Sequence, residues 1–229
     1  MTGERAGGAA EGPLVRVWPL FGLVLTTPRL VLTPVRDEHL PELIDAVLAG
    51  IHDPAEMPFT VPWTDAPREV LITETARHQW RVRAGVSREN WTINFAVLHA
   101  GRVIGVQDLN ARSFPSLRRV GSGSWLTRTA HGQGLGTEMR SAVLQFAFDH
   151  LGATSAVSEA AAWNGASLGV STRLGYAPNG TSLVEARPGE VDVQQNLLLM
   201  REDFLRPGWV VDVQGGDAAL ELLSPGTPD

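Results

Sequence analysis

The 229-residue chain contains no cysteine, which excludes disulfides, thiolate catalysis and metal sites built from cysteine. Its six histidines are scattered, and no pair has the H-E-x-x-H spacing that would place two metal ligands on one helix face. The longest early apolar run, WPLFGLVL at 18–25, is too short to span a bilayer, and no signal-peptide pattern precedes it. We therefore expect a cytoplasmic protein without a metal site.

Basic residues are also in deficit, since the net charge is −6 at pH 7. Nucleic-acid binding depends on clustered Lys and Arg, so this balance argues against such a partner. A hydrophobic content of 43% with 19% charged residues is ordinary for a soluble globular protein. Residues 1–13 are rich in Gly and Ala, and we expect a disordered tail there, a single domain over 14–215, and a second tail over 216–229.

Between the tails, apolar residues alternate between the two-residue period of strands and the 3.6-residue period of helices. The pattern predicts a strand at 29–35, helices at 37–51 and about 66–84, a hairpin of TINFAVLHA and RVIGVQDLN, a strand at 121–127, a helix at 137–150, a strand at TSAVSEA, a short helix from Asn164, and strands near 181–186 and 191–200. Such an order predicts an α/β (α+β) fold with a mixed, mostly antiparallel central sheet flanked by helices.

The stretch TRTAHGQGLGTEM at 127–139 places three glycines at alternate positions between a strand and a helix. Gly132, Gly134 and Gly136 allow positive φ, so backbone N–H groups can converge on an anion at the positive end of the helix. A tight turn with no ligand is the alternative. A Walker site needs Lys and then Ser or Thr after the last glycine, which is absent, and a dinucleotide fingerprint with Glu159 fits poorly because a hairpin precedes the turn.

Three segments carry a family resemblance: HGQGLGTEM, WNGASLGVSTRLGY and TTPRLVLTPV. Together they resemble the GCN5-related N-acetyltransferase (GNAT) superfamily, and within it the RimJ/RimL-like branch, over residues 18–205. PLFGLVLTTPRL, MPFTVPW and GSGSWL are also similar to segments of actinobacterial members that use succinyl-CoA. The resemblance implies a GNAT fold and an N-acyltransferase that moves an acetyl or succinyl group from acyl-CoA to a primary amine in a ternary complex.

By this resemblance the glycine turn holds the pyrophosphate of coenzyme A. The cradle would be formed by His131, Gly132, Gln133, Gly134, Leu135, Gly136 and Thr137. The preceding strand, with Trp125, Leu126 and Thr127, would pair with the pantetheine arm, and an amide near Leu126 would polarise the thioester carbonyl. His131 stands where the family usually has Gln or Arg, and we expect this histidine to make phosphate affinity pH-dependent.

Two proton transfers must accompany acyl transfer to an amine. Asn164 and Ser167 match the Asn-x-x-Ser of the branch, so Ser167 is expected to protonate the departing thiolate while Asn164 caps the helix. The glutamate that relatives often carry as general base is missing, because Gly121 and Ser122 stand in its place. Asp108 is our replacement candidate and Glu159 the second; a merely hydrogen-bonded strand-end acid, or an amine that arrives neutral, are the alternatives.

The acceptor site is expected in the Pro-broken segment after the first helix, where Phe59 and Trp63, with Trp80 as a third aromatic, would form a wall. The acceptor is a protein N-terminus, a lysine or a small amine, and the resemblance implies a homodimer or higher homo-oligomer. A succinyl donor would need a partner for its carboxylate, for which Arg112, Arg118, Arg119 and Arg128 are available. A non-catalytic acyl-CoA sensor or scaffold with the same fold is the alternative function.

Overall fold

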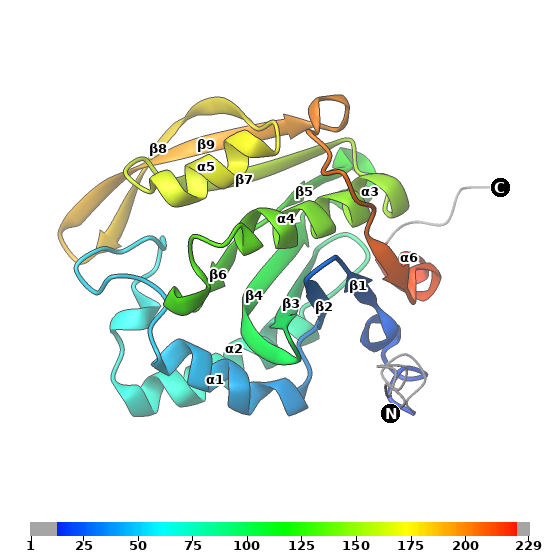
Figure 1. Cartoon of the computed structure of the whole chain (residues 1–229), viewed down its shortest axis with the longest axis horizontal. Helices are drawn as coiled ribbons and strands as arrows, with labels where there is room; N and C mark the ends of the chain where they lie inside the picture. Colours follow the sequence, from blue (N-terminus) through cyan, green and yellow to red (C-terminus); the bar gives the residue numbers. More distant parts are fainter. Residues whose placement is uncertain (1–12, 224–229) are drawn as a thin grey trace.

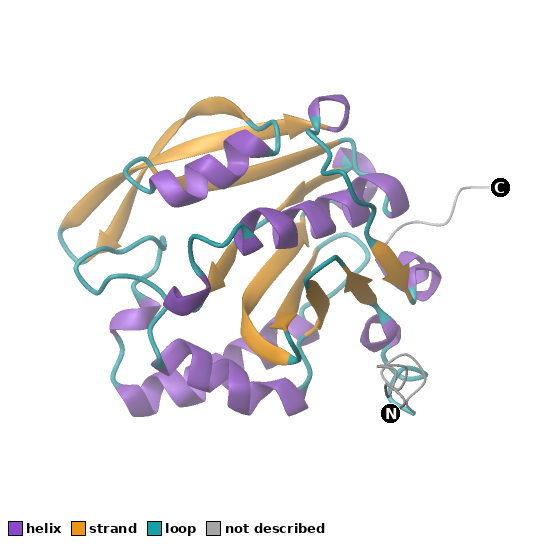
Figure 2. Cartoon of the chain, viewed as in Figure 1, coloured by secondary structure: helices purple, strands orange, loops and turns teal. Residues whose placement is uncertain are grey.

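The computed structural model describes residues 13–223, so residues 1–12 of the expected N-terminal tail and residues 224–229 lie outside the described part. Within it, ten strands form one sheet in the order β10-β1-β2-β3-β4-β5-β7-β9-β8, with β6 beside β4 (Figures 1 and 2). Only the β5–β7 pairing is parallel, which confirms the predicted mixed, mostly antiparallel sheet. The strands are β1 (Val24–Thr26), β2 (Leu30–Pro34), β3 (Trp91–His99), β4 (Arg102–Ala111), β5 (Arg119–Gly121), β6 (Ser124–Leu126), β7 (Ser155–Ala161), β8 (Ala177–Arg187), β9 (Glu190–Met200) and β10 (Asp212–Gln214).

Helices cover both faces of this sheet. α1 and α2 lie over β3 and β4 on one face, α4 crosses the opposite face, and α5 lies against β7 (Figure 1). The larger core cluster fills the α4 side, and a smaller one lies under α1. The α-helices are α1 (Leu40–Leu48), α2 (Arg68–Ala84), α3 (Phe114–Leu117), α4 (Leu135–Gln145), α5 (Gly165–Arg173) and α6 (Gly216–Leu223).

α4 follows the apolar period of its sequence. Five residues at helical spacing are all buried on one face: Met139, Ala142, Val143, Phe146 and Ala147. The predicted helix at 137–150 is real but starts two residues earlier and ends in a π-helical turn at Phe146–His150. Gly152, with φ +70°, follows this turn and ends the helical segment.

The strand predicted at 121–127 is interrupted, and this is a correction. β5 ends at Gly121 and β6 begins at Ser124, with Ser122 and Gly123 between them. The Asp108 side chain of β4 fills the space at the break, because its Oδ1 accepts from the Gly123 N–H at 2.9 Å, and a Cβ on Gly123 would lie 2.6 Å from its Oδ2. A side chain at this position would therefore force the Asp108 carboxylate to move.

The expected C-terminal tail at 216–229 is also wrong over its described half. Residues 216–223 form α6, whose Ala219 and Leu223 are fully buried in the larger core cluster. These two residues are one helical turn apart, so they share the face that packs against the 3₁₀ turn at Pro19–Gly22. The folded unit therefore extends to the last described residue.

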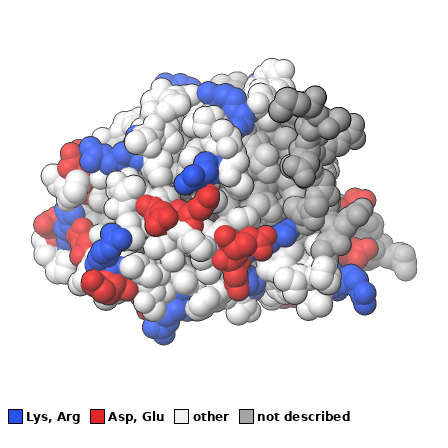
Figure 3. Space-filling model, turned by 60° about the horizontal axis from the view of Figure 1, so that its bottom comes forward, with Lys and Arg blue, Asp and Glu red and all other residues white. Residues whose placement is uncertain are grey.

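No helix among the described residues has the length and apolarity needed to cross a membrane. On the face that Figure 3 shows, acidic and basic side chains lie interspersed among other residues. Charge on this face therefore forms no field of one sign that would select a partner.

A substitution at Gly215, which joins β10 to α6, tests how much the packing of α6 contributes to stability. Gly215 has φ +67°, and a Cβ there would collide with the carbonyl of Gly22. We expect Gly215→Ala to lower the free energy of unfolding by about 3 kcal/mol, because it adds steric overlap to the strain of a positive φ. Denaturant unfolding measures the change.

Gly189→Ala is the matched control, since Gly189 has φ +79° but no atom within 4 Å of a Cβ placed on it. It should lower the free energy of unfolding by only about 1 kcal/mol, which is the strain of the backbone conformation alone. Equal losses in the two variants would show that the contact between the α6 turn and Gly22 contributes nothing.

Candidate active site

The sheet opens where β6 leaves β7. β5 pairs with β7 over three residue pairs, whereas β6, which follows the break, pairs with β4 among the described strands. The Thr127 N–H donates to the Ile104 carbonyl at 2.8 Å, toward β4. Because successive N–H groups of a strand point in opposite directions, the N–H of the adjacent residue, Leu126, points toward the opening. The Leu126 N–H on the edge predicted to pair with the pantetheine arm therefore points away from β4.

A cleft of about 1900 Å³ fills this opening and passes from the α4–α5 side of the sheet to the α2 side. Its lining includes nearly all predicted cofactor residues: Trp125, Leu126, His131, Gly132, Gly134, Leu135, Gly136, Thr137, Asn164 and Ser167. Thr127 and Gln133 are not in the lining. Thr127 faces β4 with its N–H, and the Gln133 amide turns back to donate to the Thr129 carbonyl at 2.8 Å.

The glycine turn has the geometry of an anion cradle. Gly132 and Gly134 have φ of +73° and +76°, and α4 begins directly after them without a side-chain cap on its first N–H groups. No atom lies within 4 Å of a Cβ placed on Gly132, so the concave side of the turn is open. Free N–H groups at the positive end of a helix attract a phosphate-like anion.

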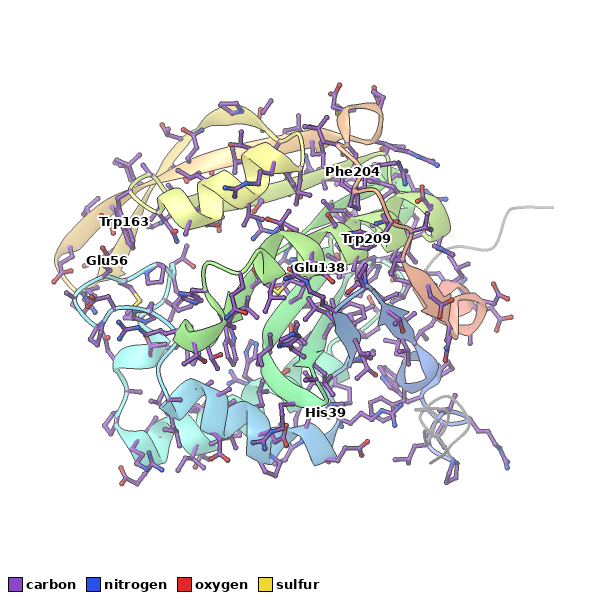
Figure 4. The ribbon with its side chains drawn as sticks, in the orientation of Figure 1. His39, Glu56, Glu138, Trp163, Phe204 and Trp209 are labelled. Atoms are coloured by element: carbon purple, nitrogen blue, oxygen red, sulfur yellow. The ribbon has the colours of Figure 1, made fainter. Side chains whose placement is uncertain are left out.

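An ion pair that the sequence did not predict holds this turn in place. Glu138, in the first turn of α4, accepts from Thr27 Oγ1 at 2.7 Å and from the Arg29 side chain at 2.6 Å. Arg29 also donates to the Gln133 carbonyl at 2.9 Å. Burial opposes ionisation of Glu138, but hydrogen bonds from Thr27 and Arg29 outweigh it and lower the pKa of the carboxyl. Figure 4 shows Glu138 between α4 and the short strands β1 and β2.

His131 lies at the free edge of β6. Its Nε2 is 3.0 Å from the carbonyl oxygen of Leu126, so the ring is turned toward the strand and away from the anion cradle. The histidine therefore occupies the side of β6 that the pantetheine arm would pair with. A direct contact between this ring and the pyrophosphate, which our expectation of pH-dependent affinity assumed, would need the ring to turn.

Asn164 and Ser167 stand at the start of α5. Asn164 caps the helix, because its Oδ1 accepts from the Ser167 N–H at 3.0 Å. The Ser167 hydroxyl lines the cleft, and none of the hydrogen bonds found among the described residues uses it. The cap thus fixes the backbone of Ser167 and leaves its hydroxyl free to donate to a ligand.

Asp108 lies at the middle of the cleft on the α2 side of the sheet. Its Oδ1 accepts from Asn110 Nδ2 and from the Gly123 N–H, each at 2.9 Å. Burial raises its pKa to about 6, although both hydrogen bonds and the charge of Arg140 favour the ionised form. Glu159, the second candidate base, lines the same cleft from β7 and is exposed.

The predicted aromatic wall is present in part. Phe59 and Trp63 line the cleft, with ring centroids 5.4 Å apart, and Trp63 continues to Trp125 of β6 at 6.3 Å. Trp80 is wrong as a wall residue, because its half-exposed ring lies outside the cleft and its Nε1 donates to Asp37 at 3.1 Å. Glu56 and Trp163, which are labelled in Figure 4, also line the cleft.

The inner face of α2 is polar, which no motif indicated. Its buried residues are Thr75 and Gln79, whereas Val70 and Ile72 are exposed. Gln79 accepts from Asn94 of β3 at 2.9 Å, and Asn94 is the cross-strand neighbour of Asp108. A helix turned with its polar residues inward suits a hydrogen-bonding pocket better than a core. Polar residues that line the cleft include Thr75, His78, Gln79, Asn94, Asn110, Gln194 and Asn196.

Comparison with known proteins agrees with this geometry. Residues 29–177 match the family model described as an acetyltransferase (GNAT) domain. The fold is similar to that of Mycobacterium smegmatis RimJ in complex with CoA-disulfide, with a TM-score of 0.67 and 18% identity, covering 89% of this chain and 95% of that one. The predicted GNAT fold is confirmed.

Two further solved structures have the same fold. One is RimL, a ribosomal L7/L12 alpha-N-protein acetyltransferase in complex with coenzyme A, with a TM-score of 0.60 and 17% identity over 76% of this chain and 95% of that one. The other is a GCN5-related N-acetyltransferase from Brucella melitensis, with a TM-score of 0.61 and 21% identity over 79% of each chain.

The glycine turn gives a direct binding test. At about 100 times its Kd, coenzyme A should stabilise the chain by roughly 2.7 kcal/mol and raise Tm by about 5–10 °C. We expect Gly132→Ala and Gly134→Ala each to weaken binding by at least about tenfold, because alanine at positive φ redirects the N–H groups. Thermal unfolding with and without coenzyme A measures this.

Gly180→Ala on β8 is the control, since Gly180 has φ +87° and open space around it but does not line the cleft. It should lower Tm as the turn variants do while keeping the full shift with coenzyme A. A full shift in the turn variants as well would mean that the glycines only reverse the chain.

Proposed function

The chain belongs to the acetyltransferase (GNAT) domain family, and we propose that it transfers an acetyl group from acetyl-CoA to the α-amino group of a protein by direct attack in a ternary complex. The observation that carries this proposal is the cleft between β6 and β7, which joins the glycine turn on one side of the sheet to the polar pocket under α2 on the other. Donor and acceptor can enter it from opposite sides and meet at the free edge of β6.

On the donor side, the pyrophosphate occupies the turn at Gly132–Gly136 and the pantetheine arm pairs with the free edge of β6. The Leu126 N–H, which points into the opening, then donates to the thioester carbonyl. The amine nitrogen bonds to that carbonyl carbon and gives a tetrahedral species with a negative oxygen and a positive nitrogen. The C–S bond breaks with its electron pair going to sulfur, one proton leaves nitrogen, and one reaches sulfur.

Asp108 and Ser167 are the candidates for these two proton transfers. Asp108 faces the acceptor side, and a pKa of about 6 leaves its carboxylate ionised at neutral pH while keeping it a better base than a surface aspartate. Ser167 has a fixed backbone and a free hydroxyl on the donor side, as a proton donor to the sulfur requires. The two residues therefore lie on the sides of the cleft where their proposed roles need them.

An α-amino group is the acceptor we favour, because the RimL neighbour is named an alpha-N-protein acetyltransferase and the acceptor pocket is rich in side-chain amides. Amides of Gln79, Asn94 and Asn110 can hydrogen-bond to the backbone of an extended peptide. Succinyl-CoA is the alternative acyl donor. Of the four arginines considered for its carboxylate, only Arg119 lines the cleft, and it does so beside β5 on the acceptor side.

The proposal is tested by thiol release. Acetyl-CoA and succinyl-CoA are each incubated with a panel of N-terminal peptides, lysine peptides and small amines, and free coenzyme A is titrated. The chain has no cysteine and no lysine, so coenzyme A is the sole thiol, and no side-chain amine of the enzyme consumes the donor. We expect acceptor-dependent release with acetyl-CoA and N-terminal peptides, and a roughly 100-fold lower kcat in Ser167→Ala.

Thr172→Ala on the same helix is the control, because that hydroxyl is exposed and bonds to the Leu168 carbonyl. It should leave kcat unchanged. If coenzyme A binds but no amine causes thiol release, the chain is the non-catalytic sensor. A preference for lysine peptides would replace the α-amino group as the proposed acceptor. A preference for succinyl-CoA would replace acetyl-CoA as the proposed donor.

The role of Asp108 gives a pH prediction. A base must be deprotonated, so kcat/KM should rise as the pH passes through about 6, and Asp108→Asn should remove that rise and lower kcat by roughly 100-fold.

The raised pKa of Asp108 also affects stability, because the folded state holds this proton better than the unfolded state does. The resulting stabilisation is complete below the usual pKa of aspartate and is lost as the pH rises through about 6.

Asp108→Asn should therefore gain in Tm relative to the unmodified chain between about pH 4 and about pH 7, while losing activity. Glu159→Gln is the control, since Glu159 is the second acid in the cleft. If Glu159→Gln removes the rise in kcat/KM and Asp108→Asn keeps it, the base is Glu159. If both keep it, the amine arrives neutral.

A further inference from the structure

We propose that Arg140 supplies the positive charge that stabilises the anionic sulfur of coenzyme A as the acyl group leaves. Arg140 lies on α4 and belongs to none of the sequence motifs discussed above. The inference rests on the acyltransferase function proposed above and adds a positioning residue to it, one that acts through the hydroxyl groups it holds.

The burial and partners of Arg140 are unusual for a cation. The residue is 4% exposed and lines the cleft. Its Nη1 donates to Ser171 Oγ at 3.0 Å and its Nη2 to Ser124 Oγ at 3.3 Å, while Nε has no partner among the described residues. Within the described part of the chain, none of the ion pairs includes it. The guanidinium is therefore buried with neutral partners only.

A buried cation without a paired anion is costly, and native proteins usually provide the counter-charge nearby. Burial lowers the pKa of Arg140, and Tyr176 and Asp108 act against this from a distance. A guanidinium nevertheless stays protonated in proteins. The remaining positive charge in a ligand-sized cleft points to an anion that the ligand brings.

The two hydroxyls held by Arg140 flank the place where the thioester would lie. Ser171 follows Ser167 by one helical turn of α5, and its Oγ donates to the Ser167 carbonyl at 3.2 Å. Ser124 directly precedes Trp125 and Leu126, the β6 residues at the free edge. The guanidinium thus bridges the helix that carries the proposed acid and the strand that carries the proposed carbonyl donor.

Charges of opposite sign face the cleft from opposite sides of the sheet. Ser124 is the cross-strand neighbour of Gln107 and lies on the α4 face with Arg140, whereas Asp108 lies on the α2 face with Asn94. The reaction moves negative charge from the carbonyl oxygen to sulfur on the donor side, while positive charge on nitrogen develops on the acceptor side. The arrangement of Arg140 and Asp108 matches that separation of charge.

Other titratable groups also face the cleft and are part of the test. These are the lining residues His52, Asp53, Glu56, Glu74, His78, Arg81, Asp108, Arg119, His131, Glu159 and Arg173. The buried Tyr176 also interacts electrostatically with Arg140. Arg173 is the best control, because it is an exposed arginine on α5, the helix that Arg140 contacts. Its charge lies in water at the rim of the cleft, where screening is strong.

The pKa of the coenzyme A thiol, measured while coenzyme A is bound, tests the proposal. Thiolate absorbance is followed against pH in the full chain and in Arg140→Met, Arg140→Lys and Arg173→Met, and the absence of cysteine makes coenzyme A the only thiol observed. We expect the bound thiol to have a lower pKa than free coenzyme A. Arg140→Met should raise it by about 1 unit, Arg140→Lys should largely restore it, and Arg173→Met should leave it unchanged.

In turnover, Arg140→Met should lose roughly 100-fold in kcat with little change in KM for the acyl donor, and Arg140→Lys should recover most of it. A bound thiol whose pKa is the same in the unmodified chain and in Arg140→Met overturns the proposal, even if turnover falls. Should Arg140→Met fail to fold, Arg140→Gln and Arg140→Lys provide the same comparison of neutral and charged side chains.

The thiol titration needs only bound coenzyme A, so it separates the two proposals. Turnover together with an unchanged thiol pKa leaves the acyltransferase function standing and removes the role of Arg140. A lowered thiol pKa without turnover on any amine supports the role of Arg140 in charge stabilisation and overturns the catalytic function. Absence of coenzyme A binding overturns both.

Discussion

The separation of the chain from β7 after Ser122 is the constraint on which the rest of the site depends. At this point the Asp108 carboxylate accepts from the Gly123 N–H at 2.9 Å. β5 stays paired with β7, while β6 follows β4 alone. A strand that stayed paired with β7 beyond Ser122 would close the sheet at the cleft and would occupy the Leu126 N–H. The side chain proposed as the base therefore lies where the sheet opens.

Hydrophobic periodicity predicted the class of the fold and most long elements, because α4 and the β3–β4 hairpin bury continuous faces whose spacing the sequence displays. It could not predict the break at Ser122 and Gly123, where the Gly123 N–H donates to a side chain from another strand. It also missed α6, whose buried residues Ala219 and Leu223 are too few to form a period and whose position depends on contact with Gly22. Short strands such as β1 and the edge strand β10 depend on their pairing partners in the same way.

The residues of the site also fall into two groups, those that local sequence predicts and those that it does not. Residues within one motif, such as Gly132, Gly134, Asn164 and Ser167, could be predicted because local spacing alone brings them to the cleft. The pair of Arg29 and Glu138 spans 109 residues of sequence, and no local pattern joins them. The polar inner face of α2 was also missed, because a helix with Thr75 and Gln79 inside has no apolar stripe to mark which side faces the sheet. The sequence therefore did not predict which residues far apart in the chain lie together at the site.

Buried polarity is concentrated where the sheet opens, and this has a physical reason. Asp108, Arg140 and Tyr176 are placed at a cost in stability, since each loses solvation that its partners replace only in part. The apolar cluster between α4 and the sheet, with Phe95, Phe146 and Leu144 fully buried, is large enough to offset that cost. Apolar residues at the three polar positions would be expected to stabilise the fold, yet they would leave a reaction that separates charge in a cleft without fixed charges. The structure therefore gives up stability at the opening of the sheet, where acyl transfer needs a polar environment that is already in place.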